Sequence, residues 1–173
     1  MLDCPAADIK LQRRRQIPKV IIYTDGSCIG KPGPGPGGYG IVLLYGNHYR
    51  KELSGGYRET NAPRMELLAA IKGLTALNKP CEVILHSDAT YVVKNKDNAK
   101  VWQANEWRVK DGGKCKNQDL WELFLPLLDK HQVEFKKVKA HSGNEENERC
   151  DTLAKTAARG RDLPRDNGFE DRE

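Results

Sequence analysis

The chain has 173 residues, enough for one ordinary domain with a real hydrophobic core but not for a second domain of similar size. Its 29 Lys and Arg against 24 Asp and Glu give a formal charge of +5, which fits a polyanionic partner without requiring one. Five cysteines without a C-x-x-C pair argue against a disulfide framework or a structural zinc site, so we expect a reducing cytoplasm. No apolar run approaches the roughly 18 residues of a membrane span, so we expect no membrane partner.

Less patterned segments flank the predicted domain. Residues 1–18 include Arg13-Arg14-Arg15 and show no sustained periodicity, which predicts a flexible basic N-terminal arm. The patterned part of the chain covers 19–158, and 159–173 is a polar C-terminal tail. We therefore expect one domain with an extension at each end.

Apolar runs separated by turn signals predict a three-stranded meander. Val20–Tyr23 is apolar on both faces, as in a central strand that is covered on both sides. The Gly-Pro run over 30–38 predicts a tight exposed connection, because glycine admits positive φ and proline fixes its own φ. Tyr39–Tyr45 and Tyr49–Leu53 follow as two strands around the turn-forming pair Gly46-Asn47.

Helical periodicity alternates with apolar strands in the rest of the chain. Further strands are predicted over 83–85 and 133–138, and helices over 62–77, 89–96, 99–109, 117–130 and 144–158. A strand reached through a helical crossover is normally parallel to the strand before it. We therefore expect an α/β fold with a mixed five-stranded sheet, three antiparallel strands followed by two parallel ones, flanked by helices.

Four acidic residues lie where apolar packing alone does not require them. Asp25 and Asp88 each end an apolar strand. Glu66 lies among apolar neighbours of the first predicted helix, and Asp151 lies on the last one, four residues after Asn147. If the strands that end at Asp25 and Asp88 are adjacent and parallel, both carboxylates emerge at the same edge of the sheet, where open α/β sheets bind ligands.

Such a cluster of carboxylates predicts a divalent-metal site. Clustered carboxylates repel one another, and hard oxygen ligands suit Mg²⁺ or Mn²⁺. Two such ions about 3.5–4 Å apart stabilise both the attacking and the leaving oxygen of a phosphoryl displacement. We therefore predict two Mg²⁺ ions, with Mn²⁺ as a substitute, and phosphodiester hydrolysis. His141 precedes the last helix in a Gly-containing loop, where an imidazole can carry a proton to or from the leaving group.

Several short segments, taken in order, resemble the pattern of bacterial type 1 ribonuclease H, also called ribonuclease HI. The resemblance covers roughly residues 19–158, and the segments are jointly specific although Thr-Asp-Gly-Ser alone is not. The segments are Thr24-Asp25-Gly26-Ser27, Gly37-Gly38-Tyr39-Gly40, Arg64-Met65-Glu66-Leu67, Ser87-Asp88, Asn117-Gln118-Asp119-Leu120-Trp121 and His141 through Asp151.

The resemblance implies an endonuclease that cuts the RNA strand of an RNA–DNA hybrid and leaves 5′-phosphate and 3′-hydroxyl ends. It assigns product departure to His141, and to Glu66 a contact with the 2′-hydroxyl that distinguishes RNA from DNA. The implied metal ligands are Asp25, Glu66, Asp88 and Asp151. The implied nucleic-acid contacts are Gly26, Ser27, Thr60, Asn61, Arg64, Lys94, Lys96, Trp102, Trp107 and Asn117. We expect the protein to act as a monomer.

This chain departs from the family pattern on the surface that contacts the hybrid. It has Ala62-Pro63 where many relatives have asparagines, and Lys31 and Ala89-Thr90 replace polar residues that are often used there. Trp102 and Trp107 fit helix packing as well as contacts with sugars. These departures affect affinity more than chemistry, because none of them removes a proposed metal ligand.

Two other functions fit the same fold. One is a hybrid-binding module that no longer cuts, and the complete set of acids argues against it. The other is a polynucleotidyl transferase of the integrase kind. The His141 loop and the Asn117 motif argue against this second function.

Overall fold

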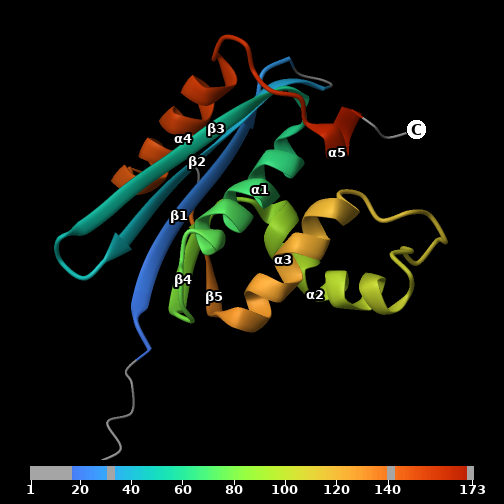
Figure 1. Ribbon diagram of the computed structural model, residues 1–173, viewed down its shortest axis with the longest axis horizontal. Coiled ribbons are helices and arrows are strands. Elements are labelled where there is room, and N and C mark those ends of the chain that lie inside the picture. The colour runs from blue at the N-terminus through green and yellow to red at the C-terminus, as the bar shows by residue number, and fades with distance from the viewer. Residues whose placement is uncertain (1–16, 31–33, 140–142, 171–173) are drawn as a thin grey trace, which may run out of the picture.

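The computed structural model describes residues 17–30, 34–139 and 143–170, which form five strands and five helices (Figure 1). The strands are β1 (Lys19–Cys28), β2 (Gly35–Tyr45), β3 (Tyr49–Thr60), β4 (Glu82–Ser87) and β5 (Gln132–Lys137). The helices are α1 (Ala62–Thr75), α2 (Thr90–Ala104), α3 (Gln118–Lys130), α4 (Glu145–Ala158) and α5 (Asn167–Glu170).

The strands form one sheet in the order β3-β2-β1-β4-β5. β2 is antiparallel to both β1 and β3, and β4 is parallel to both β1 and β5. The antiparallel strands β2 and β3 are joined by a short turn in which Gly46 has a positive φ of 60°. β4 and β5 are reached through helices, as parallel strands must be. The predicted fold class is confirmed.

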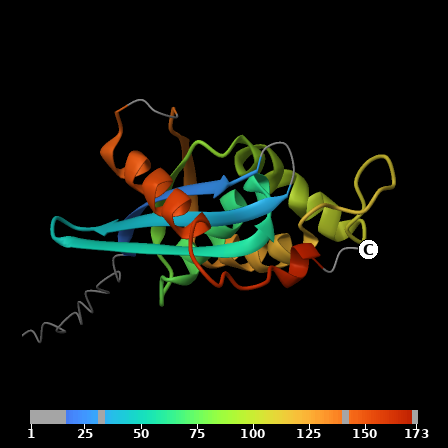
Figure 2. The same cartoon turned by 90° about the horizontal axis from the view of Figure 1, so that it is seen from above.

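Helices cover both faces of the sheet (Figures 1 and 2). Ile41 of β2 is fully buried in the same core as the α1 residues. A Cβ on the preceding residue, Gly40, would instead overlap the backbone of α4. Because successive residues of a strand face opposite sides, α1 and α4 lie on opposite faces. α2 and α3 lie on the α1 side.

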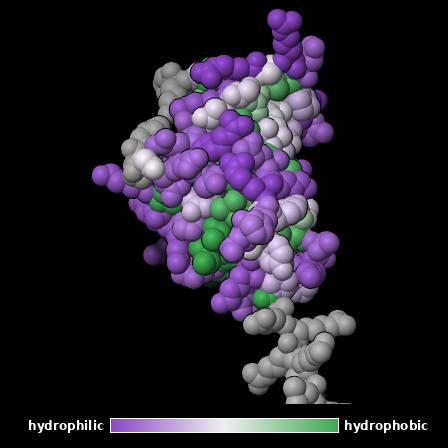
Figure 3. Space-filling model, turned by 90° about the vertical axis from the view of Figure 1, so that its left-hand side faces the viewer, coloured by the Kyte–Doolittle hydropathy of each residue, from purple (hydrophilic) through white to green (hydrophobic). Residues whose placement is uncertain are grey.

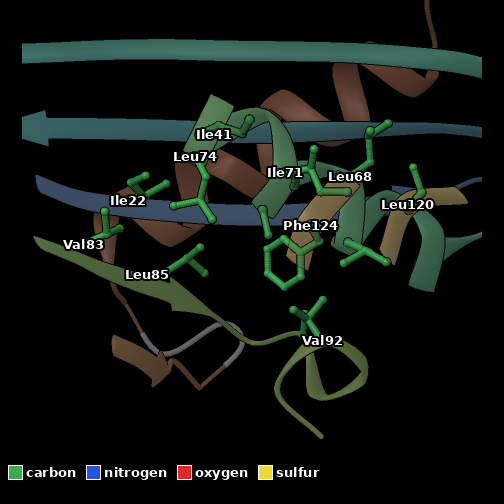
Figure 4. Packing of buried hydrophobic residues seen from close by; sticks show 14 of the residues in the cluster. Ile22, Ile41, Leu68, Ile71, Leu74, Val83, Leu85, Val92, Leu120 and Phe124 are labelled. Atoms are coloured by element: carbon green, nitrogen blue, oxygen red, sulfur yellow. The ribbon is translucent and has the colours of Figure 1, made fainter. Parts of the chain in front are cut away.

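The main hydrophobic core fills the space between the sheet and α1, α2 and α3 (Figure 4). Leu68, Ile71 and Leu74 recur at helical spacing on α1 and lie over the sheet residues. Trp121 and Phe124 of α3 are fully buried with them and pack edge to face, with ring centroids 5.7 Å apart. This core fixes α1 over the middle of the sheet.

Two local predictions are wrong. The two helices expected over 89–96 and 99–109 are a single helix, α2, and the chain leaves it near Asn105, before positive φ values at Glu106 and Trp107. The run over 30–38 is not entirely a loop, because Gly35–Gly38 belong to β2. Glycines are suited to this part of the strand, because a Cβ on Gly38 would overlap the backbone of α4 and a Cβ on Gly37 would overlap the side chain of Thr60.

The described part of the polar tail, residues 159–170, contributes to the fold. The Arg58 N–H of β3 donates to the carbonyl of Pro164 at 3.0 Å, and the Arg58 guanidinium pairs with Glu170 at 2.7 Å. Asp166 is buried, with 6% of its surface exposed. Polar composition in this segment therefore reflects charge pairing with the domain.

The face shown in Figure 3 is largely hydrophilic, and its apolar side chains form small groups. Within the described residues, none of the helices has the length and apolar character that crossing a bilayer demands.

Candidate active site

The parallel pairing of β1 and β4 brings two of the predicted acids together, although β1 continues to Cys28 and does not end at Asp25 as predicted. The two strands pair in parallel with Thr24 opposite Ser87, so Asp25 and Asp88 are the next residues on neighbouring strands. This adjacency confirms the predicted register. Asp25 is 9% exposed, and its Oδ1 accepts a hydrogen bond from the N–H of Gly26 at 2.8 Å. The two carboxylates therefore lie at the same edge of the sheet.

Helix α1 contributes Glu66 to this edge. Its N-cap is Asn61, whose side chain accepts from the N–H of Arg64 at 3.0 Å, and Pro63 occupies the first turn, where its missing N–H costs nothing. Gly26 determines how closely α1 approaches, because a Cβ there would overlap the backbone of Glu66. Glycine at this position allows the first turn of α1 to lie directly against β1.

Helix α4 contributes Asp151 from the opposite face of the sheet. Its N-cap Asn144 accepts from the N–H of Asn147 at 3.0 Å. Gly40 plays the part for α4 that Gly26 plays for α1, since a Cβ there would overlap the carbonyl of Cys150. Asn147 and Asp151, one turn apart, face the same side of the helix. The sheet therefore receives carboxylates from both of its faces.

All four predicted acids line one cavity of about 390 Å³. Burial raises the pKa of Asp25 to about 8, with repulsion from Asp88 and Asp151 adding to the effect. Burial also raises the pKa of Glu66 to about 7, and the charge of Asp88 contributes. Both shifts have the sign expected when carboxylates are gathered with too little positive charge among them.

The donor set suits a hard divalent cation. The acids supply only oxygen ligands, as Mg²⁺ and Mn²⁺ prefer. Asn147 also lines the cavity, and its buried Oδ1 has no hydrogen-bond partner in the described part of the chain. Among residues 17–30, 34–139 and 143–170, however, no three acidic, histidine or cysteine side chains form a closed metal site. The oxygen donors fit the predicted metal by their chemistry.

Gly26 and Ser27 line the cavity, as a contact with nucleic acid would require. Asn61 is half-buried and caps α1. Ala62, from the departing pair Ala62-Pro63, and Thr90 also line the cavity. Two of the residues that depart from the family pattern therefore lie beside the acids.

Arg64, a predicted nucleic-acid contact, is held by two carboxylates. Its guanidinium is 3% exposed and donates from Nε to Oδ2 of Asp166 at 2.7 Å and from Nη1 to Oδ1 of Asp119 at 2.8 Å. Thr60 is also buried and donates its hydroxyl to Asp166 at 2.9 Å. Asn117 is 4% exposed, and its Nδ2 donates to the hydroxyl of Tyr91 at 3.1 Å. In the structure, these predicted contacts belong to a buried polar network.

The remaining predicted contacts lie on or after α2. Lys94 is exposed, whereas Lys96 lies over the ring of Phe135 with Nζ 5.7 Å from its centroid. Trp102 packs edge to face on Trp121 with centroids 6.0 Å apart. Trp107 also packs against the core and is only partly buried. Both tryptophans have a packing role.

His141 and Lys31 lie outside the described residues. Sequence reasoning missed Lys155, which lines the cavity and whose Nζ is 2.6 Å from Oδ2 of Asp151. Its position four residues after Asp151 on a predicted helix was an available signal. No local signal pointed to the pairing of Asp166 with Arg64, because those residues are distant in sequence.

The comparisons with known proteins agree with this architecture. The family model for RNase H matches residues 18–159. Ribonuclease H of Syntrophus aciditrophicus is 56% identical over 153 residues, covering 87% of each chain. Ribonuclease HI of Synechocystis is 50% identical over 152 residues, covering 87% of this chain and 94% of the relative.

Solved structures show the same fold. LC9-RNase H1, described as a type 1 RNase H with the type 2 active-site motif, superposes with a TM-score of 0.73 at 28% identity, over 82% of this chain and 72% of that one. LC11-RNase H1, solved in complex with an RNA/DNA hybrid, has a TM-score of 0.59 at 22% identity, over 80% and 96% of the two chains. With the family model and the relatives spanning most of its length, the chain belongs to the ribonuclease H family.

Proposed function

We propose that the protein is a metal-dependent endonuclease that hydrolyses the RNA strand of RNA–DNA hybrids, leaving 5′-phosphate and 3′-hydroxyl ends. The observation that carries the proposal is the meeting of Asp25, Glu66, Asp88 and Asp151 in one cavity at the sheet edge. Membership of the ribonuclease H family supports the substrate class. The protein acts as a monomer.

The four carboxylates hold two Mg²⁺ ions, for which Mn²⁺ substitutes. When bound, these ions supply a nucleophilic water and charge neutralisation at the scissile phosphate. Asp25 lies within β1 and Asp88 directly follows β4, so the pairing of these adjacent strands leaves both backbones little freedom to move. Glu66, near the N-terminus of α1, also accepts a hydrogen bond from the 2′-hydroxyl that only the RNA strand carries.

Proton transfer at the leaving group is assigned to His141. The attacking water loses a proton to solvent as its oxygen bonds to phosphorus, the bond from phosphorus to the 3′-oxygen breaks, and His141 gives a proton to that departing oxygen. This assignment rests on the position of His141 in the sequence. The hybrid is held by Gly26, Ser27, Asn61 and the α2 region.

The decisive experiment compares the unmodified protein with Asp25→Asn. Labelled RNA–DNA hybrid, double-stranded RNA, double-stranded DNA and single-stranded RNA are incubated with Mg²⁺ or Mn²⁺. The unmodified protein cuts only the hybrid efficiently, and Asp25→Asn loses at least about a thousandfold in rate, as removing a central charged group does. Asp129→Asn, an exposed acid on α3, serves as the matched control and keeps full activity.

The alternatives predict different outcomes. An unmodified protein that binds hybrid and leaves it intact with both metals would be a binding module. A strand-transfer product would indicate integrase-like chemistry. Retained cutting by a folded Asp25→Asn protein would contradict the assignment of that residue.

A further inference from the structure

The carboxylate cavity contains one lysine, and that lysine already holds one of the proposed metal ligands. Lys155 and Asp151 are one turn apart on α4, with Nζ 2.6 Å from Oδ2. Among the described residues that line the cavity, Lys155 is the only cationic one, beside five acids. Within the described part of the chain, it is therefore the one positive side chain in the cavity that a phosphate would enter.

The ion pair between Lys155 and Asp151 can open easily, so that either side chain can take another partner. The side chains of Lys155 and Asp151 are 43% and 25% exposed, so water and ions reach both. Such a pair contributes little to stability, because solvent screens it. Lys155 has a flexible stem, and its ammonium can leave Asp151 without any change in the backbone.

Other cations near the site are not available in the same way. Arg64 is 3% exposed and held by Asp119 and Asp166. Lys96 is paired with Asp97 and lies over Phe135. Among the described residues that line this cavity, Lys155 is therefore the cation that can turn toward an entering phosphate.

We propose that Lys155 is an exchangeable counter-ion, which occupies Asp151 in the free protein and moves to a phosphate of the bound nucleic acid, so that nucleic acid and divalent metal promote each other's binding. The inference rests on the proposed function, because it takes a nucleic acid as the ligand. While the ammonium holds Oδ2, it competes with a metal ion for Asp151. A phosphate that takes the ammonium frees the carboxylate for the metal, and thermodynamic linkage makes the effect reciprocal.

The plain alternative is a helix-stabilising pair. An acid followed by a lysine four residues later is a common stabilising arrangement on solvated helices. That role predicts a small change in stability when Lys155 is replaced. It predicts no change in the coupling between metal and nucleic acid.

The test measures Mn²⁺ binding by calorimetry with and without a hybrid whose RNA strand carries 2′-O-methyl groups and stays uncut. In the unmodified protein, the hybrid tightens Mn²⁺ binding by a measurable factor. Lys155→Met binds Mn²⁺ about threefold to tenfold more tightly without hybrid, because a competing charge is gone. With hybrid the gain disappears, so the coupling factor falls by about the same amount.

Two further variants complete the design. Lys155→Arg keeps the charge and keeps most of the coupling. Lys19→Met removes a lysine at the start of β1, which pairs with Glu82 of β4. It leaves the Mn²⁺ affinity unchanged both with and without hybrid. This variant controls for the general loss of one positive charge.

The outcomes separate this inference from the proposed function. An equal coupling factor in Lys155→Met and the unmodified protein overturns the exchange while the cutting activity stands. A protein that binds neither the hybrid nor Mn²⁺ overturns both. A lower coupling factor in Lys155→Met, kept by Lys155→Arg, supports the exchange.

Discussion

The buried pairing of Arg64 with Asp166 predicts that the C-terminal segment stabilises the whole domain. The Asp166 carboxylate accepts from Nε and Nη2 of Arg64 at 2.7 and 2.9 Å and from the hydroxyl of Thr60 at 2.9 Å. The side chains of Arg64 and Asp166 are 3% and 7% exposed. Replacing Asp166 with alanine therefore leaves a buried guanidinium with half of its negative partners.

The expected loss is about 3 kcal/mol. Breaking a buried ion pair by removing one partner costs about 3–5 kcal/mol. The low end applies here, because Arg64 keeps Asp119, whose side chain is 43% exposed and reaches water. At about 2–4 °C per kcal/mol for a protein of this size, the midpoint of thermal unfolding should fall by about 6–12 °C.

Urea unfolding followed by circular dichroism checks the value, with EDTA present to keep metals from stabilising the folded state. The midpoint should fall while the m-value stays constant. Asp129→Ala, which removes an exposed acid paired with Lys100, is the control and should change stability by less than about 0.5 kcal/mol. A loss for Asp166→Ala no greater than that of the control would refute the reasoning.

Four more outcomes are expected. Because the raised pKa values of Asp25 (about 8) and Glu66 (about 7) mean that metal must displace protons, Mn²⁺ affinity should rise at least about tenfold from pH 6 to pH 8, and a flat profile by calorimetry would contradict this. Because these two carboxyls keep their protons to higher pH in the folded state than in the unfolded chain, the metal-free protein should lose stability as pH rises from about 4 through 8. Thermal melts at each pH should show a smaller loss for Asp25→Asn. Gly40→Ala should push α4 away from the sheet and weaken Mn²⁺ binding more than Gly46→Ala, whose position faces open space; equal affinities would show that the close approach does not position Asp151. His141→Ala should slow multiple-turnover cutting without abolishing it, and an unchanged rate would remove its role in proton transfer.

Much of the candidate site followed from local context. Asp25 and Asp88 follow apolar strands, and the crossover rule makes those strands parallel, so their proximity could be predicted. Glu66 and Asp151 could be assigned to helices from periodicity and caps. Helix α2 was predicted as two helices, because its sequence lacks a strong apolar stripe; in the structure only Val92 and Ala99 of this helix are buried.

The role of Arg64 could not be predicted in the same way. The family resemblance implied a contact of Arg64 with nucleic acid, which stays a prediction. The structure shows its guanidinium paired with Asp119 and Asp166. The composition of the C-terminal segment was as polar as a solvated tail. Whether a charge is solvated or paired depends on what folds beside it, which periodicity does not record.

By itself, the sequence determined the order of the five strands, their antiparallel and parallel pairing and the identity of the four acids, because these follow from short-range patterns and from the chain's handedness. Only the tertiary structure decided which basic side chains form ion pairs with which acids. Arg64 is committed to buried carboxylates, and Lys155 is left exposed on Asp151. Electrostatic partnership depends on distance and burial across elements that are far apart in the chain, and packing sets both.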